Sequence, residues 1–228
     1  MSLVTETIYG MDGTGRPEGP KMIERHGEIE FDTATHRYSV NGRDVPSVTQ
    51  ALKAARLIDF SMIPQAVLLH AAQRGRLVHL ALEYLDRGEL DEETLDPQIA
   101  GYVEAGKRFY RESGFVVDRI ECRIYNPTWG YAGTFDRTGW LGKQDTVLDW
   151  KTGLSLPAHE LQLIGYALAL PEPRKYRRLS VGLNDDGTYR MHEYEAAKFD
   201  RASRAFLAAV MCAQWRMENE KGFRIWEQ

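Results

Sequence analysis

The feature that most constrains the fold is a β-hairpin predicted within residues 131–151. Two runs that alternate between apolar and polar residues, Tyr131–Gly139 and Asp145–Lys151, flank a short turn-prone segment. A turn centred between Gly142 and Lys143 gives every residue of the first run a fixed partner in the second. The sequence therefore predicts two antiparallel strands in a defined register.

That register places Asp136 directly opposite Asp149, and Lys151 projects from the same face as Asp149 because residues two apart share a face. Two carboxylates opposite each other repel and destabilise a hairpin. A divalent cation between them removes the repulsion, since carboxylate oxygens are its usual ligands. The simpler alternative is a surface hairpin whose charges form ordinary salt bridges.

Polar residues on two predicted helices extend this group. Gln162 and Tyr166 are four apart on a helix expected over residues 157–170, so they share a face. Upstream, Ser61 is expected to cap a long helix that ends at Arg87, before Gly88. The second half of this helix is apolar almost all round, which predicts burial. His79 and Glu83 lie on one face of it.

These residues together resemble the motifs of the PD-(D/E)XK nuclease superfamily and, within it, the RecB-like, phage-type exonuclease branch. The resemblance covers residues 74–194. Phe135 stands where the superfamily's name has proline, and many members of this branch lack that proline. The matching residues are Gly75, His79, Gly133, Asp136, Asp149, Lys151, Thr152, Gly153, Gln162 and Tyr166.

The resemblance implies an α/β fold with a mixed central β-sheet flanked by helices, a restriction-endonuclease-like αβββαβ core. Residues 29–45 alternate around Asn41-Gly42, which predicts an N-terminal β-meander as an extension to this core. A capping box at 47–50 predicts a helix directly after it. We expect a mobile tail at 1–21, the meander and helix at 22–60, and the nuclease domain at 61–228.

The resemblance also implies hydrolysis of DNA phosphodiester bonds with Mg²⁺ or Mn²⁺, and an imidazole ligand favours Mn²⁺. The implied catalytic residues are Asp136, Asp149 and Lys151, where Lys151 either holds the water or phosphate or takes a proton from the water. The implied metal ligands are His79, Asp136, Asp149 and the backbone carbonyl of Trp150, with Glu121 as a further ligand. The implied supporting or substrate-binding residues are Glu83, Gln162, Tyr166, Arg74 and Arg76.

Simpler alternatives stand beside several of these roles. A lone histidine on an apolar helix, such as His79, is usually an ordinary core residue, and Glu83 is equally suited to a structural pair within the helix. The aromatic residues Trp129, Tyr131 and Trp150 suit either base stacking or the core.

Composition limits the partners. Lysine and arginine number 29 against 33 acidic residues, a net charge of −4, whereas nucleic-acid binders usually carry a basic surface. Local basic groups offset this, although they are equally consistent with ordinary solvated faces. They are Arg74/Arg76, Lys107/Arg108/Arg111 and Arg174/Lys175/Arg177/Arg178.

Two cysteines exclude the four-cysteine iron–sulfur cluster of some related nucleases. No apolar run approaches a membrane span and no signal peptide is evident, so we expect a cytoplasmic protein of a bacterial or phage-infected cell. No Gly-rich phosphate loop is present, so we expect no nucleotide cofactor, and unwinding falls to a helicase or recombinase partner. The oligomeric state, including a homo-oligomer, stays open.

The expected function is a DNA exonuclease of phage or prophage recombination or repair, acting on single- or double-stranded DNA. One alternative is a non-catalytic nucleic-acid-binding module, against which the intact Asp136/Asp149/Lys151 set argues because binding alone needs no opposed carboxylates. A second is a restriction-type endonuclease, which would cut closed circular DNA.

Overall fold

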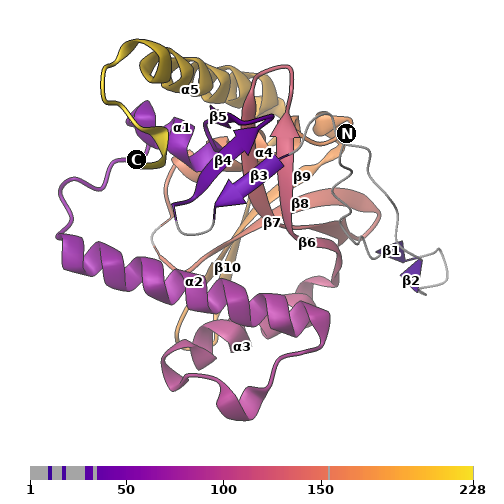
Figure 1. The fold of residues 1–228 in the computed structure, drawn as a ribbon. Helices are drawn as coiled ribbons and strands as arrows, with labels where there is room; N and C mark the ends of the chain where they lie inside the picture. Colours follow the sequence, from indigo (N-terminus) through magenta and orange to yellow (C-terminus); the bar gives the residue numbers. More distant parts are fainter. Residues whose placement is uncertain (1–9, 12–16, 19–28, 33–34, 154, 228) are drawn as a thin grey trace.

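The computed structural model describes residues 10–11, 17–18, 29–32, 35–153 and 155–227 (Figure 1). Most of the expected tail at 1–21 lies outside these residues. Within it, β1 (Gly10–Met11) and β2 (Pro17–Glu18) form an antiparallel pair. The division of the chain into tail, extension and nuclease domain stays a prediction.

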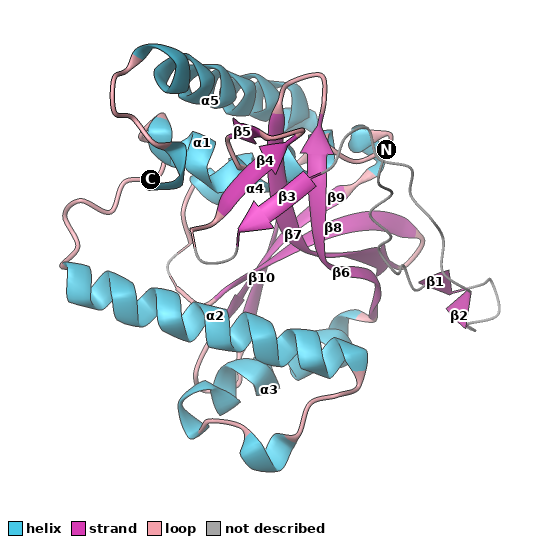
Figure 2. Ribbon diagram, in the orientation of Figure 1, coloured by secondary structure: helices cyan, strands magenta, loops and turns pink. Residues whose placement is uncertain are grey.

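A five-stranded mixed sheet forms the centre of the molecule, in the spatial order β10-β9-β8-β7-β6 (Figure 2). β8 and β9 are parallel and every other neighbouring pair is antiparallel. Its strands are β6 (Phe115–Asn126), β7 (Tyr131–Leu141), β8 (Gln144–Lys151), β9 (Arg177–Leu183) and β10 (Tyr189–Glu193). The expected α/β class with a mixed central sheet is therefore confirmed.

Helices cover both faces of this sheet. One face packs on α2 (Gln65–Arg87) and α3 (Pro97–Ser113), and the other on α1 (Val48–Ala54), α4 (Ala158–Leu168) and α5 (Phe199–Asn219). Short 3₁₀ turns are η1 (Glu92–Thr94), η2 (Pro173–Lys175), η3 (Ala196–Lys198) and η4 (Ile225–Glu227). Among the described helices, none has the length and apolar character that a bilayer crossing requires.

The predicted hairpin register is confirmed. Paired residues run from Leu141 and Gln144 at the turn to Arg137 and Leu148. The observed pairs end there, one position before Asp136 and Asp149, which a continuation of this register would place opposite each other. Gly142 in the turn has a φ of 65°, a conformation that glycine adopts without strain. The tight turn thus brings the two acidic strands together.

The N-terminal β-meander is also confirmed, as β3 (Ile29–Asp32), β4 (Arg37–Val40) and β5 (Arg43–Val45). The Asn41-Gly42 turn between β4 and β5 has φ values of 53° and 72°, as a tight primed turn requires. The meander is joined to the central sheet where Ala132 of β7 donates its N–H to the carbonyl of Pro46, at 3.0 Å.

The expected capping box opens α1. Gln50 N–H donates to the Ser47 hydroxyl at 3.2 Å, and Ser47 N–H donates to the Gln50 side-chain oxygen at 2.9 Å. Val48 and Leu52 are buried in the same core as α4 and α5. The extension therefore shares a hydrophobic core with the central sheet.

Two expectations for α2 are wrong. Ser61 does not cap it, because the helix begins at Gln65 after Pro64. A proline disfavours helical geometry in the residue before it, here Ile63, so the helix does not extend back to Ser61. Its second half is not buried all round either: Leu80 is 45% exposed and Tyr84 43% exposed. One side of α2 packs on the body and the other faces solvent.

Candidate active site

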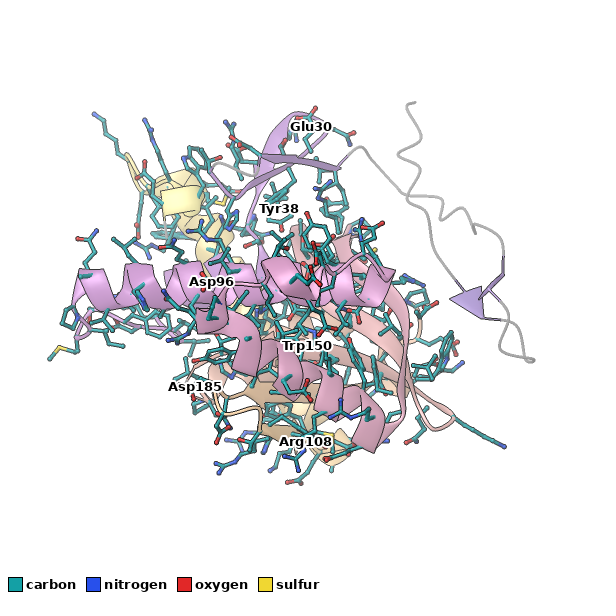
Figure 3. All side chains as sticks on the ribbon, turned by 90° about the horizontal axis from the view of Figure 1, so that it is seen from below. Glu30, Tyr38, Asp96, Arg108, Trp150 and Asp185 are labelled. Carbon is teal, nitrogen blue, oxygen red and sulfur yellow. The ribbon has the colours of Figure 1, made fainter. Side chains whose placement is uncertain are left out.

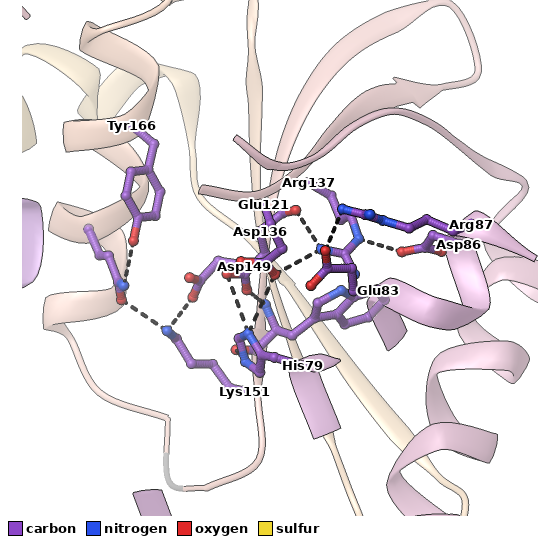
Figure 4. A network of polar contacts seen from close by, with 12 residues as sticks. His79, Glu83, Asp86, Arg87, Glu121, Asp136, Arg137, Asp149, Lys151 and Tyr166 are labelled. Atoms are coloured by element: carbon purple, nitrogen blue, oxygen red, sulfur yellow. Dashed lines mark hydrogen bonds and ion pairs between the residues drawn. The ribbon is translucent and has the colours of Figure 1, made fainter. Parts of the chain in front are cut away.

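Three potential metal ligands converge where α2 crosses the sheet (Figure 4). They are His79 on α2, Glu121 on β6 and Asp136 on β7. His79 Nδ1 lies 3.5 Å from Asp136 Oδ1 and 4.0 Å from Glu121 Oε1. All three ligand atoms lie within 4.8 Å of one another. We refer to these three residues as the donor group.

Strand pairing explains the position of Glu121. The pairs Ile120–Arg137 and Cys122–Phe135 place it directly opposite Asp136. Its backbone is left-handed, with a φ of 47°, which is uncommon for a residue other than glycine and costs on the order of 1–3 kcal/mol. Such strain persists where neighbouring contacts hold the residue in place. Here those contacts direct the Glu121 carboxylate towards His79 and Asp136.

The ring of His79 is oriented by the backbone of β8. Its Nε2 lies 3.2 Å from the carbonyl oxygen of Trp150, so Nδ1 faces the two carboxylates. Metal-binding histidines usually donate their second ring N–H to a carbonyl or carboxylate. The Trp150 carbonyl, expected as a metal ligand, thus contacts His79 in this structure. Its role as a ligand stays a prediction.

The donor group has the chemistry and the spacing that a divalent cation requires. Mg²⁺ binds oxygen at about 2.1 Å in octahedral geometry, so neighbouring ligands lie about 3 Å apart and opposite ones about 4.2 Å. The two separations from His79, 3.5 and 4.0 Å, lie in this range, and every separation within the group is at most 4.8 Å. One imidazole with two carboxylates suits Mn²⁺ and Mg²⁺. The residues present therefore fit a divalent metal.

Asp149 and Lys151 lie beside the donor group rather than within it. The Lys151 ammonium forms an ion pair with Asp149 Oδ2 and donates to Gln162 Oε1 at 2.9 Å. Gln162 Nε2 donates in turn to the Tyr166 hydroxyl at 2.9 Å. Residues from β8 and α4 thus form one continuous series of polar contacts (Figure 4), in which Gln162 and Tyr166 position the Lys151 ammonium. Metal binding by Asp149 stays a prediction.

Arg137 is a central residue that the sequence analysis missed. Its side chain is fully buried and donates to Glu121 Oε1 at 3.0 Å and to the Asp136 carbonyl at 2.6 Å. On its other side it forms an ion pair with Asp86 of α2. Arg137 therefore holds Glu121 in its strained position. Its place directly after Asp136, inside the first predicted strand of the hairpin, was the signal available in the sequence.

The charges of the donor group balance one another. Burial lowers the pKa of His79, but Asp136 and Glu121 outweigh burial and raise it to about 9. Burial raises the pKa of Asp136, but His79, Lys151 and Arg137 outweigh it, so the pKa of Asp136 is lowered. The positive imidazole thus neutralises the acidic pair in the metal-free site, and it would have to release its proton to bind a metal.

Glu121 and Asp149 have pKa values that are raised towards neutral pH. Burial, together with Asp136, raises the pKa of Glu121 to about 7 although Arg137 opposes the shift. Burial also raises the pKa of Asp149 to about 6, against the opposing charge of Lys151. Crowded buried carboxylates with raised pKa values are typical of active sites.

A cleft of about 730 Å³ opens onto the donor group. Its floor includes His79, Glu121 and Gly133, and α2 forms one wall with Arg76 and Glu83. The opposite wall is formed by the N-terminal sheet and α1. Two of the three members of the donor group, His79 and Glu121, are therefore accessible to a ligand from solvent, while Asp136 lies buried behind them.

The glycine of the Gly-x-x-Asp motif has a packing role. A side chain at Gly133 would bring its Cβ within 3.1 Å of Val48 and 3.3 Å of Tyr166. Glycine there lets α1 and α4 approach β7 closely, which brings Tyr166 towards the site.

The expected basic surfaces are largely neutralised. Arg108 and Arg111 on α3 pair with Glu112 and Glu104, and the remaining cations of these two groups also have acidic or backbone partners. Figure 3 shows Arg108 at the molecular surface. The alternative of ordinary solvated faces is the better description of these groups.

The supporting residues occupy different places. Arg74 donates to the Thr152 carbonyl at 3.0 Å, so it braces the end of β8 rather than lining the main cleft. Arg76 lines the cleft. Glu83 pairs with Arg87 at 2.5 Å, which is a structural pair within the helix.

Of the three aromatic residues with two interpretations, Tyr131 and Trp150 are fully buried and Trp129 is 39% exposed. Tyr131 also donates its hydroxyl hydrogen to the Gly165 carbonyl at 2.7 Å. Trp150 lies in the interior beside α3 (Figure 3) and packs edge-on against Phe109. Tyr131 and Trp150 therefore belong to the core.

His159, near Lys151, should titrate far below an ordinary histidine. Burial and the charge of Lys151 lower its pKa to about 4, and its neutral Nδ1 accepts the Leu156 N–H at 3.3 Å. Because the folded pKa lies below the unfolded value of about 6.5, this contribution to stability is complete above pH ~6.5 and is lost as the pH falls towards 4. An NMR titration should give a midpoint near 4, which returns to about 6.5 in urea. A folded-state midpoint of 6.5 or higher would contradict the burial of this ring.

No family model and no curated protein match the chain. Among solved structures, a "putative exonuclease" from Eubacterium rectale is similar with a TM-score of 0.48 and 10% identity, over 64% of this chain and 68% of that one. An alkaline exonuclease from Laribacter hongkongensis is similar with a TM-score of 0.36 and 16% identity, over 74% of this chain and 90% of that one. The complex of that exonuclease with dAMP is similar with a TM-score of 0.35 and 16% identity, over 78% of this chain and 94% of that one. These three structures are described as exonucleases, but likenesses at this level carry no argument about the function of this chain.

Proposed function

We propose that this protein is a divalent-metal-dependent nuclease that hydrolyses DNA phosphodiester bonds. The observation that carries the proposal is the convergence of His79, Glu121 and Asp136 beside the Asp149–Lys151 pair, with His79 and Glu121 lining an open cleft. Ordinary salt bridges do not require an imidazole and two carboxylates from three separate elements to meet at metal-ligand spacing. The resemblance to the RecB-like exonuclease branch supports the same function.

The donor group would hold Mg²⁺ or Mn²⁺, which supplies an activated water and neutralises charge on the phosphate during hydrolysis. Lys151 is placed to hold the phosphate or the attacking water, since Gln162 and Asp149 fix its ammonium beside the donor group. Asp149, with a pKa of about 6, is suited to accept a proton from that water near neutral pH. Water attack at phosphorus then breaks the bond to the leaving sugar oxygen.

We propose that the enzyme acts from DNA ends, as an exonuclease of phage or prophage recombination or repair. Purified protein incubated with Mg²⁺ or Mn²⁺ should degrade linear DNA to nucleotides, and EDTA should stop the reaction. Closed circular DNA of the same sequence is the matched control and should stay intact. Nicking or linearisation of the circle would instead identify an endonuclease, and resistance of both DNAs with either metal would overturn the proposed function.

A further inference from the structure

The cleft wall opposite α2 carries an aromatic stack that the reaction itself does not use. The ring of His36 is stacked on Phe31, with centroids 5.6 Å apart and planes 25° apart. Phe31 in turn lies 4.5 Å from Tyr38. The Tyr38 hydroxyl is 2.8 Å from the Thr134 hydroxyl on β7, two residues before Asp136. The stack is therefore fastened to the strand that carries the candidate metal site.

His36 is held in an uncommon backbone conformation. Its φ is 53°, and its carbonyl accepts a hydrogen bond from Gln50 Nε2 at 2.9 Å. Gln50 is itself fixed by the capping box of α1. The imidazole is exposed and lines the cleft, with one face against Phe31. Uncommon backbone conformations of this kind cluster at active sites and ligand-binding sites.

Positive charge lines the same cleft. Lys53 of α1 and Arg76 of α2 lie on its two walls. Among the described residues Arg76 makes no ion pair, in contrast to the basic residues of α3 and η2. A ring for stacking in the same cleft as cationic side chains is the pattern with which proteins bind nucleic-acid strands whose bases are unpaired.

We propose that His36, backed by Phe31, is a stacking platform for an unpaired nucleobase, so that DNA enters the cleft as a single strand. The proposal rests on the proposed function for the position of the scissile phosphate at the donor group. A cleft of about 730 Å³ has the size of a site for a small ligand, which corresponds to a few nucleotides rather than a duplex. A base offers its face to a protein ring only after it has left the helical stack.

Binding without cleavage tests the platform. Labelled oligothymidine and a blunt hairpin duplex are titrated in EDTA, and affinity is measured by fluorescence anisotropy. His36→Asn removes the ring but tolerates the left-handed backbone, and His36→Tyr restores a ring. His192→Asn is the matched control, because His192 is an exposed histidine on β10 whose ring contacts Tyr194 at 4.5 Å.

The wild type should bind the single strand more tightly than the duplex. His36→Asn should weaken single-strand binding roughly 5- to 150-fold, the worth of one stacked base. His36→Tyr should recover part of that loss, because tyrosine supplies a ring but fits the left-handed backbone less well than histidine. His192→Asn should bind like the wild type. A strand with one abasic position, placed where it meets His36, should bind the wild type more weakly than the intact strand. The abasic and intact strands should bind His36→Asn equally, because the ring that the missing base would contact is already absent.

Unchanged binding by His36→Asn, equal binding of both DNAs, or no binding at all would overturn the platform. The cleavage assay separates this from a failure of the proposed function. Binding that depends on His36 without cleavage in Mg²⁺ or Mn²⁺ would keep the platform and remove the nuclease. Cleavage with no effect of His36→Asn on affinity would keep the nuclease and remove the platform.

Discussion

Asp136→Asn should lower the rate of DNA cleavage by at least about 10³-fold, equivalent to about 4 kcal/mol of activation free energy. Asp136 lies at the centre of the site, opposite Glu121 and next in register to Asp149, and 3.5 Å from His79 Nδ1. Asparagine keeps the shape and still accepts the Trp150 N–H, which bonds Asp136 Oδ2 at 2.6 Å. The variant therefore removes mainly the charge that a cation requires.

Asp145→Asn is the matched control, because it removes a carboxylate at the far end of the same hairpin, opposite Trp140. Both variants should unfold at nearly the temperature of the wild type in EDTA. Isothermal titration with Mn²⁺ alone should show weakened binding for Asp136→Asn and unchanged binding for Asp145→Asn. Full cleavage or full Mn²⁺ affinity in Asp136→Asn would contradict the site.

Arg137→Met should destabilise the protein by about 3–5 kcal/mol, the usual cost of removing one partner of a buried ion pair. The Arg137 side chain is fully buried between Asp86, which is 3% exposed, and Glu121. Burial lowers the pKa of Arg137, but Asp86, Tyr110 and Glu121 outweigh it and raise the pKa above the ordinary value. Methionine keeps most of the volume but leaves two carboxylates without their cation.

Urea unfolding in EDTA at pH 7 measures this loss, which corresponds to a fall in Tm on the order of 10 °C. Arg111→Met is the matched control: Arg111 is 62% exposed and pairs with Glu104, so its removal should cost no more than about 1 kcal/mol. Adding Asp86→Leu to Arg137→Met should recover part of the stability, because it removes one unpaired charge. A loss as small as that of Arg111→Met would show that the buried pair contributes little.

Features set by neighbouring residues were predictable from the sequence. The hairpin register followed from a turn of two residues at Gly142, and the start of α1 from the reciprocal bonds of Ser47 and Gln50. The helix α3 begins after Asp96, which accepts the Gln98 N–H at 2.9 Å, and ends before Gly114 with a φ of 67°. In each case the deciding contacts join residues only a few positions apart.

Predictions failed or stayed incomplete where distant elements decide. One failure was local: Ser61 suits a helix cap by its residue type, but Pro64, only three residues later, moved the start of α2. The apolar residues of α2 suggested burial on all sides, yet packing on α3 and the sheet uses only one side. The basic groups of α3 and η2 looked available for DNA until their acidic partners were known.

The sequence by itself determined the hairpin of β7 and β8 and its register, because a tight turn and a two-residue side-chain period leave one register. Only the tertiary structure decided that Glu121 joins Asp136, that Arg137 is buried against Asp86, and that an aromatic wall faces α2. These contacts join segments far apart in the chain. Their geometry depends on how the helices and the N-terminal sheet pack on the central sheet, which no local pattern specifies.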